Sequence, residues 1–539
     1  MSLRTALLAL ALFASSFAPP PSSVTPQGGY TRERFPELGV DLDRPRDYEA
    51  IPTQPDEQFV VLYYAEKLDP DPAKRRSARP ELSVVDITFV PDPPPPEPDP
   101  VPPPAPEEDD EEGRSKAKPV ERAKEAPPPP PVSTLERWFE RHTGWDLGRS
   151  QPGKPRAGWT STIYTLTLRR PGGARLAGFC YAYRQEGQRT VAFVATCSPE
   201  DLEEQEKIWR HMAEKADLSA PEAQDLTKLE QKYARAGLRG ADYRIKVRQK
   251  MVRGWKAEDT ENFIVLYHTN DQPLIRTLLA DIESIRREYI KLFPPAGEIT
   301  AVSTVRVCRD RTEYMAYGGP PGSAGYWNYA AEELVFYDAQ VKEKGKRASG
   351  DANTFIVLYH EAFHQYIHYS AGEVPPHSWF NEGHGDYFSG ADVVGSKVRK
   401  IGLNPWRIGT IQRAVEQGKF VPWKDIIGFE QPEYYRGDRV GLCYAQGWSM
   451  IYFLRQSPVV AKHPQWSKIL DTYFQELKLD YSRSLAQLEV QGRKDDRRAK
   501  AEVGVASRKY ALSKAFDGVD IAALEAEWAA FVSKLEYKR

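Results

Sequence analysis

TFIVLYHEAFHQYIH, residues 354–368, places His360, Glu361 and His364 in the spacing H-E-x-x-H. The residues before His360 are apolar on every face, which predicts a buried helix over about residues 352–369. Side chains four residues apart share one face of a helix, so the two histidines can bind the same metal ion. Glu361 lies beside them, where a carboxylate can accept a proton from a water molecule at that ion. The stretch therefore predicts a hydrolytic metal centre, for which two imidazoles favour zinc.

A catalytic zinc site takes three protein ligands and leaves a fourth position open for water. The third ligand is expected in WFNEGHGDYF, residues 379–388, which predicts a second helix. Glu382 lies 18 residues after His364, on a helix that can return antiparallel to the first. Asp386 follows four residues later on the same face, where it can accept the second N–H of a ligand histidine. We therefore expect His360, His364 and Glu382 to bind Zn²⁺, with Asp386 behind them.

The spacing Asn381-Glu382-x-x-x-Asp386 resembles the N-E-x-x-x-D pattern of thermolysin-like enzymes. Together with H-E-x-x-H, it resembles the gluzincin clan of zinc metallopeptidases. The chain more closely resembles the bacterial peptidase MA-like domains of uncharacterised function, over roughly residues 258–480. The residues that carry this resemblance are His360 to Gln365, Pro376, Trp379, Glu382, Gly383, Tyr387, Phe388, Tyr444, Ala445, Gln446 and Trp448.

This resemblance implies a zinc metallopeptidase that acts on peptide or protein substrates, with Glu361 as the general base. It also implies a tyrosine that donates to the carbonyl oxygen of the substrate, about 60 residues after the glutamate ligand. Tyr444 stands at this spacing and at the start of a predicted helix, although a packing role for Tyr444 is also open. Tyr434 and Tyr435 are the alternatives for the same role.

Three further histidines and one strand near the site have plainer interpretations. His368 is off the ligand face and is expected to support or pack, and His377 is expected on a surface loop or at the rim. His384 stands where the family often has a small or apolar residue, and it is expected to face away from the metal. Residues 333–338, ELVFYD, are either an edge strand that pairs with an extended peptide or an ordinary strand of the sheet.

Two rival functions stay open from the sequence. One is an inactive relative that keeps the metal for stability while another part of the chain binds a cell-envelope partner. Glu361 argues against it, because a purely structural zinc site does not need that carboxylate. The other is a zinc hydrolase that acts on a bond other than a peptide bond, by the same chemistry.

The chain has 539 residues, too many for a single compact core, and its formal net charge is −2. This balance gives no indication of nucleic-acid binding. After MSLR, an apolar run over residues 6–14 is too short to span a bilayer and is typical of a signal peptide. We therefore expect a signal peptide over residues 1–18, export to the periplasm or outside the cell, and no membrane span after cleavage.

The rest of the chain predicts two domains. Residues 19–35, rich in proline and serine, predict a flexible leader. Residues 36–218 predict a small α+β domain, in which a disordered insertion rich in proline and charge, 91–132, separates strands of one sheet. The element order resembles small domains of the PsbP type, and binding a cell-envelope partner is the expected role. A helical connector, 219–257, leads to a metallopeptidase-like domain, 258–539, with a mixed sheet first and helices afterwards, an α+β order.

Export would permit disulfides, but the spacing of the cysteines argues against one. A turn at Glu186 and Gly187 would pair Cys180 with a residue near positions 191–193, leaving Cys197 roughly four residues out of register. That is ~13 Å along a strand, too far for a disulfide. All four cysteines are therefore expected to be buried and free: Cys180, Cys197, Cys308 and Cys443.

Overall fold

The computed structural model describes residues 29–53, 57–69, 74–89, 132–168, 175–252, 254–295, 297–329, 331–339 and 354–536. The chain divides into two compact units, the first formed by residues 1–53 and 57–223 and the second by 54–56 and 224–539. The expected α+β class is confirmed, with a strand-rich first unit and a mostly helical end to the second. The predicted signal peptide and most of the predicted insertion (91–131) lie outside the described residues.

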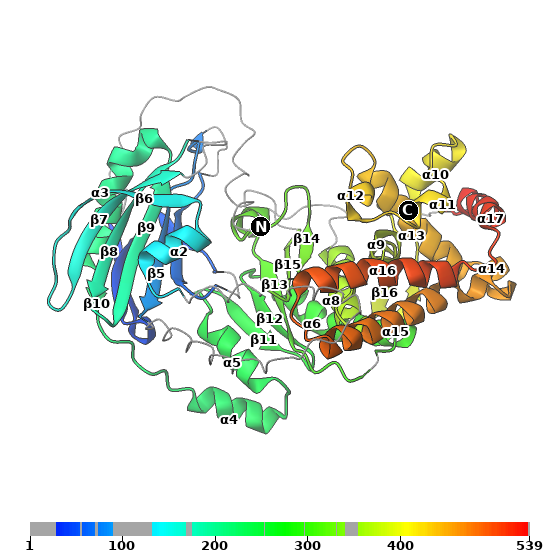
Figure 1. The fold of residues 1–539 in the computed structure, drawn as a ribbon, viewed down its shortest axis with the longest axis horizontal. Coiled ribbons are helices and arrows are strands. Elements are labelled where there is room, and N and C mark those ends of the chain that lie inside the picture. The colour runs from blue at the N-terminus through cyan, green and yellow to red at the C-terminus, as the bar shows by residue number, and fades with distance from the viewer. Residues whose placement is uncertain are drawn as a thin grey trace, which may run out of the picture. The chain divides into compact units, whose positions relative to one another are not determined.

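The first unit contains two antiparallel sheets and two main helices (Figure 1). The seven-stranded sheet has the order β3-β4-β5-β9-β8-β7-β6, so strands from both sides of the insertion pair through β5 and β9 as expected. The three-stranded sheet has the order β1-β2-β10. The elements are β1 (Tyr30–Phe35), β2 (Val40–Pro45), β3 (Tyr48–Ala50), β4 (Val60–Glu66), β5 (Glu81–Thr88), α2 (Leu135–His142), β6 (Trp145–Pro152), β7 (Thr160–Leu168), β8 (Ala177–Gln185), β9 (Arg189–Cys197), α3 (Leu202–Lys215) and β10 (Asp217–Leu218), with 3-10 turns at Pro36–Leu38 and Pro199–Asp201.

Alternation along β8 explains how the large sheet fills two cores. Successive side chains on a strand point to opposite faces. Tyr181 and Tyr183 therefore pack with Trp209 of α3 on one face, whereas Cys180 and Ala182 pack with α2 on the other. Each face is covered by one helix, as a two-sided apolar sheet requires.

Two predictions for the first unit need correction. Residues 30–35 do not belong to a leader, because they form β1 and pair with β2. This strand is polar and is held by ion pairs such as Arg44 with Glu33, so it lacks the apolar alternation that signals a strand.

Cys180 pairs with Val194, just beyond the expected residues, and Cys197 lies opposite Ala177. The conclusion about the cysteines is confirmed, since all four are buried and free.

The second unit opens with two helices and a five-stranded sheet in the order β11-β12-β13-β15-β14. The three inner strands are parallel, and the two edge strands, β11 and β14, are antiparallel to their neighbours. Helices α6 and α8 pack on one face of the sheet, and α5 and α7 pack on the other. The elements are α4 (Thr227–Ala236), α5 (Ala241–Gln249), β11 (Lys256–Asp259), β12 (Phe263–Tyr267), α6 (Gln272–Leu292), β13 (Ser303–Cys308), α7 (Arg311–Ala316), β14 (Gly325–Asn328), β15 (Glu333–Tyr337) and α8 (Thr354–Ser370).

The predicted connector is part of this second unit. Arg244 of α5 is fully buried, donates to Asp259 of β11, and also donates to the backbone carbonyl of Phe263. A buried guanidinium that is fully hydrogen-bonded fixes the elements that it joins. Residues 224–257 therefore belong to the folded unit and are not a separate linker.

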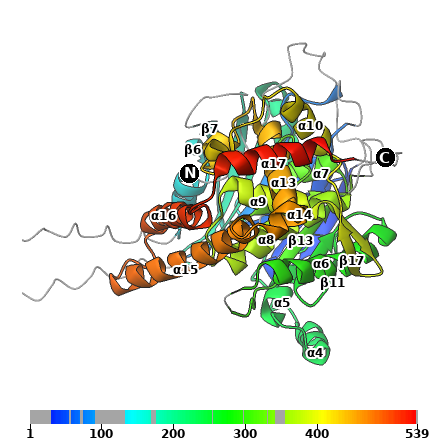
Figure 2. The same cartoon turned by 90° about the vertical axis from the view of Figure 1, so that its right-hand side faces the viewer.

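The remaining elements are helical except for one hairpin that the sequence did not predict. Helix α9 lies next to α8, and α13 packs against α9 (Figure 2). The elements are α9 (Ser378–Phe388), β16 (Ala391–Val394), β17 (Lys397–Ile401), α10 (Ile408–Glu416), α11 (Trp423–Ile426), α12 (Gln431–Tyr434), α13 (Val440–Gln456), α14 (Pro458–Lys462), α15 (Ile469–Val490), α16 (Arg497–Ala515) and α17 (Ile521–Ser533), with a 3-10 turn at Trp466–Lys468.

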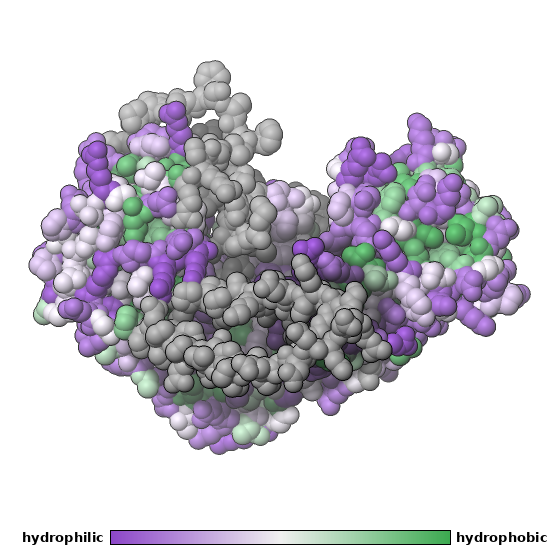
Figure 3. Space-filling view, in the orientation of Figure 1, coloured by the Kyte–Doolittle hydropathy of each residue, from purple (hydrophilic) through white to green (hydrophobic). Residues whose placement is uncertain are grey.

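Hydrophobic residues gather on the face in Figure 3 over the C-terminal helices of the second unit, the part coloured yellow to red in Figure 1. Within the described ranges, no helix combines the length and the apolar character needed to cross a membrane.

Candidate metal centre

Helices α8 and α9 bring the predicted ligands together. α8 packs against β14 and β15 on one side and against α9 on the other, so it is buried along most of its length. All eleven residues of α9 are buried. Two glycines allow its close approach: a Cβ at Gly383 would lie 2.6 Å from the Gly447 carbonyl oxygen of α13, and one at Gly385 would lie 2.8 Å from the His360 ring.

His360, His364 and Glu382 form one buried cluster. Their candidate ligand atoms all lie within 4.8 Å of one another. His360 Nε2 is 3.0 Å from Glu382 Oε2, and His364 Nε2 is 3.4 Å from the same oxygen. The side chains are only 12%, 8% and 7% exposed. Two imidazole nitrogens and a carboxylate oxygen at this spacing could hold a metal ion, as the sequence predicted.

The far nitrogen of each histidine is held by an oxygen acceptor of α9. His360 Nδ1 is 3.3 Å from Asp386 Oδ1, and His364 Nδ1 is 3.1 Å from Asn381 Oδ1. Each acceptor favours the tautomer with the proton on Nδ1, which leaves Nε2 free to bind a metal. This donor arrangement fits a zinc ion, because zinc ligand histidines commonly donate their second N–H to such acceptors.

Asp386 is itself fixed by residues just before α10. Arg407 Nε donates to Asp386 Oδ2 at 2.7 Å, and Asn404 donates to the Asp386 backbone carbonyl at 3.0 Å. The expected position of Asp386 behind His360 is therefore what the structure has. Arg407 therefore holds Asp386, and Asp386 orients the His360 ring from outside the cluster.

Charges in the cluster shift the titration of its members. Burial opposes the charged form of His360, but its contacts with Asp386 and Glu382 outweigh burial and raise its pKa to about 10. Burial also works against ionised Glu382, but the two imidazoles outweigh it and hold the pKa of this carboxyl well below its usual value. The cluster therefore carries an ionised carboxylate that favours the protonated form of the His360 ring.

Glu361 lies next to the cluster and outside it. Its side chain is partly exposed, and its carboxylate accepts a hydrogen bond from the backbone N–H of Trp327 in β14. Burial raises the pKa of Glu361 above its usual value, although His360 and His364 act in the opposite direction. A raised pKa suits a carboxylate that takes up a proton and releases it again.

The three predicted tyrosines have different positions. The Tyr435 hydroxyl donates to Glu382 Oε1 at 2.5 Å, so it holds the oxygen that does not face the histidines. The Tyr434 hydroxyl is buried and donates to the Cys443 carbonyl, which leaves it a packing role. The Tyr444 ring lies 6.3 Å from the His360 ring, under the guanidinium of Arg407.

The other histidines near the site lie outside the cluster. His384 Nδ1 donates to the Phe380 carbonyl, and its Nε2 accepts from Arg455, so its ring is turned away from the cluster as expected. The His368 ring packs near Trp327 and Tyr329, in the packing role expected for it.

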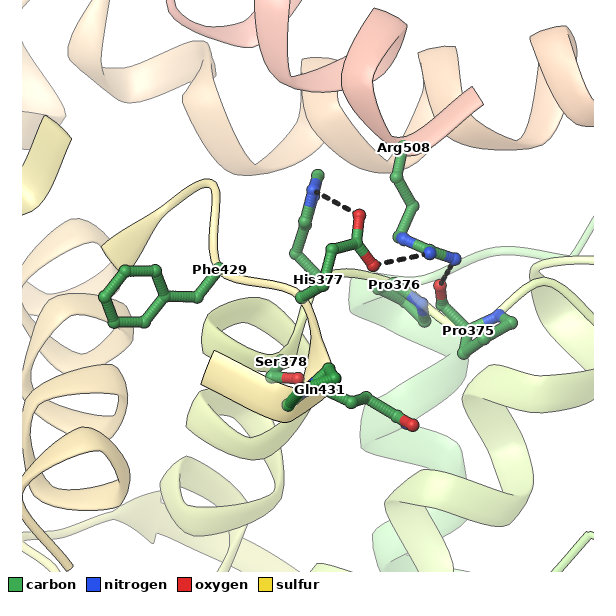
Figure 4. A pocket seen from close by; sticks show the side chains of 9 residues that line it. Pro375, Pro376, His377, Ser378, Phe429, Gln431 and Arg508 are labelled. Atoms are coloured by element: carbon green, nitrogen blue, oxygen red, sulfur yellow. Dashed lines mark hydrogen bonds and ion pairs between the residues drawn. The ribbon is translucent and has the colours of Figure 1, made fainter. Parts of the chain in front are cut away.

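The prediction of a surface position for His377 is wrong. His377 is 2% exposed, and the Tyr473 hydroxyl lies 2.9 Å from its Nδ1. It lines a cavity of about 200 Å³ at the start of α9, where Glu430 lies between the His377 ring and the Arg508 guanidinium (Figure 4). The residue precedes α9, and the packing of α15 and α16 over that helix end buries it.

Strand β15 is not an edge strand, so that alternative is also wrong. It lies between β13 and β14, and β14 forms the edge next to α8. The sequence did not predict β14, because its four residues lie directly after a glycine-rich loop and carry no alternation long enough to recognise.

The sequence analysis assigned no role, or only a secondary one, to four residues of the site. They are Asn381, Tyr435, Arg407 and Tyr329. Asn381 is part of the quoted N-E-x-x-x-D spacing, so a signal for it existed. Arg407 and Tyr329 lie far from the ligands along the chain and in no recognised pattern. Only the packing of the helices and β14 brings them to the cluster.

Gly385→Ala is expected to weaken metal binding at the cluster about tenfold or more, because misorienting a ligand costs ~10–100-fold in affinity. The new methyl group would collide with the His360 ring, 2.8 Å from its Cε1 and Nδ1. Competition with a chromophoric chelator measures the affinity. Gly441→Ala is the control, since a Cβ there meets nothing within 4 Å. Equal affinities of the two variants would contradict the tight fit between α9 and His360.

Comparisons with known proteins give no functional assignment. No protein-family model and no curated protein matches the chain. Among solved structures, the solution structure of cyanobacterial PsbP (CyanoP) from Synechocystis sp. PCC 6803 is similar at 8% sequence identity and a TM-score of 0.22. The match covers 37% of this chain and 100% of that one. A likeness this weak supports no argument about function.

Proposed function

We propose that this chain is an exported, zinc-dependent peptidase of the gluzincin type. The observation that carries the proposal is the buried cluster of His360, His364 and Glu382, with the far nitrogen of each histidine held by Asp386 or Asn381. Glu361 stands beside this cluster and is not needed to complete it, which favours a catalytic site over a structural one.

A zinc ion at the cluster would supply a Lewis acid that activates water and polarises a carbonyl group. Glu361 takes the proton from the attacking water and passes it to the leaving amine. Its contact with the Trp327 N–H keeps the carboxylate oriented while it does so. Asp386 and Asn381 keep both imidazoles turned toward the reacting group, and Tyr435 fixes the orientation of Glu382.

Tyr444 is the candidate donor to the carbonyl oxygen of the substrate. It lies beside His360 and is partly exposed, so a bound peptide can reach it. The Arg407 guanidinium over its ring, 4.8 Å from the ring centroid, fixes the position of that ring. A hydroxyl aimed at a developing oxyanion stabilises the transition state more than the substrate.

Strand β14 favours a peptide as the substrate. It is an edge strand, and an extended peptide can add to such an edge through backbone hydrogen bonds. Its Trp327 N–H donates to the Glu361 carboxylate. A peptide laid along β14 would therefore pass the general base.

The alternative is a weak or inactive zinc protein that acts as a binding or scaffold module in the cell envelope, with the first unit as its binding part. A hydrolase that acts on another bond is the second alternative. Both predict zinc binding, so only a turnover measurement separates them from the peptidase.

The test is cleavage of a peptide library by the purified chain, followed by mass spectrometry. We expect cleavage by the zinc-loaded protein, loss of cleavage after removal of metal with a chelator, and recovery when zinc is restored. A zinc-loaded protein that cleaves no peptide in the library would favour the scaffold alternative and contradict the proposal.

A further inference from the structure

Tyr329 is a tyrosine near the metal centre that the mechanism above does not use. It follows β14 directly, and its side chain is 46% exposed. Its ring centroid lies 5.5 Å from that of His368 on α8 and 6.2 Å from that of Trp327. The Trp327 ring also lies near His368, with the ring centroids 6.1 Å apart. An accessible aromatic side chain thus lies against the helix that carries the ligands.

The Tyr329 hydroxyl lies close to the Asn381 side chain. The Asn381 side chain is its hydrogen-bonding partner and acts to lower the pKa of the hydroxyl. Asn381 Oδ1 already faces His364 Nδ1 at 3.1 Å, so the amide nitrogen of Asn381 is the group left to donate to the Tyr329 oxygen. In this arrangement Tyr329 accepts from Asn381, and its own proton stays free to donate to a bound molecule.

The surroundings keep that proton in place. Desolvation raises the pKa of the hydroxyl to about 12, and the nearby charges of Glu382 and Glu361 act in the same direction. Desolvation therefore favours the neutral, donating form of the Tyr329 hydroxyl.

Tyr435 and Tyr444 occupy other positions around the cluster than Tyr329 does. The Tyr435 hydroxyl is engaged by Glu382 Oε1, and Tyr444 lies beside His360. Tyr329 lies on the other side of the cluster, beside His364. It contacts Asn381, and Asn381 in turn contacts His364. A peptide running along β14 would meet Tyr329 at the end of that strand, next to Glu361.

We propose that Tyr329 is a catalytic residue whose hydroxyl donates a hydrogen bond to the carbonyl oxygen of the peptide bond being cleaved, from the side of His364. This role rests on the proposed peptidase function. It adds a donor just after the end of β14 to the one expected from Tyr444.

Tyr329→Phe tests the role, because it removes only the hydroxyl and keeps the ring that packs on His368 and Trp327. With the best substrate from the peptide library, kcat is expected to fall ~10²-fold, as for loss of one oxyanion donor, with KM changed by less than about threefold. Zinc content and thermal unfolding should match the wild type. Tyr510→Phe is the control, since Tyr510 has a similarly exposed side chain on α16 and no contact with the cluster among the described residues.

Three outcomes would overturn the role of Tyr329 while leaving the peptidase proposal intact. They are an unchanged kcat/KM, a loss that lies entirely in KM, and a loss of zinc, which would mean that Tyr329 acts only by holding Asn381. A wild type that cleaves nothing would instead count against the proposed function.

A binding measurement decides the role of Tyr329 without turnover. An N-phosphoryl dipeptide carries a tetrahedral anionic group that resembles the attacked carbonyl, and calorimetry gives its affinity for the zinc-loaded protein. We expect Tyr329→Phe to weaken it about tenfold or more relative to Tyr510→Phe. Equal affinities for the two variants, or no binding to the wild type, would overturn the assignment.

Discussion

Glu361→Gln is expected to lower kcat for peptide hydrolysis by about 10³-fold while leaving zinc bound. Loss of a general base costs ~10²–10⁴-fold, and the amide cannot take up the proton of the attacking water. Metal binding should persist because Glu361 lies outside the ligand cluster. Gln has nearly the shape of Glu and can still accept from the Trp327 N–H.

Kinetics on one library substrate and metal analysis of the same samples measure the two effects together. Glu416→Gln is the matched control, an exposed glutamate at the end of α10. Full activity of Glu361→Gln would remove Glu361 from the mechanism. Loss of both zinc and activity would make it a group that supports the metal rather than a base.

Glu382→Gln is expected to weaken zinc binding by more than the ~10–100-fold that loss of an outer partner costs. Glu382 supplies the negative charge between the two imidazoles, with its Oε2 3.0 Å from one and 3.4 Å from the other. The amide removes that charge and keeps an oxygen for the Tyr435 hydroxyl. The effect should therefore report ligand loss rather than a rearranged helix.

Chelator competition measures the affinity of Glu382→Gln, and circular dichroism checks that α8 and α9 remain folded. Glu416→Gln again serves as the charge-matched control. If the affinity of Glu382→Gln stays within about twofold of the control, Glu382 is not a ligand and the three-residue cluster is wrong.

The two pairs of side chains that build the cluster were predictable because local spacing determines each pair. His360 and His364 share one helix face whatever the surrounding fold, and Asp386 follows Glu382 at the same spacing on α9. The fold class was predictable for a similar reason, since the apolar residues that predicted β8, α6 and α8 are largely buried in the structure.

The residues around the ligands were harder to predict because long-range packing places them. Arg407 reaches Asp386 only after the hairpin of β16 and β17, which carries too little apolar alternation to be recognised. Tyr329 approaches Asn381 because β14, which it follows, packs against α8. His377 is buried by helices that come about a hundred residues later, and no local pattern signals such burial.

Polar strands and charged connecting segments were mispredicted from the sequence for another reason. β1 is held by ion pairs across the strands rather than by apolar alternation, and α5 is fixed by one buried arginine, Arg244. In both cases, charged residues that are typical of a solvated surface instead hold elements of a folded unit together.

The central claim is that His360, His364 and Glu382 bind zinc, and metal analysis of the purified 539-residue chain tests it most directly. We predict about one zinc per chain in the wild type and none in a His360→Ala, His364→Ala double variant that remains folded. A folded wild-type protein that holds no zinc after equilibration with the metal, with both histidines intact, would contradict the claim.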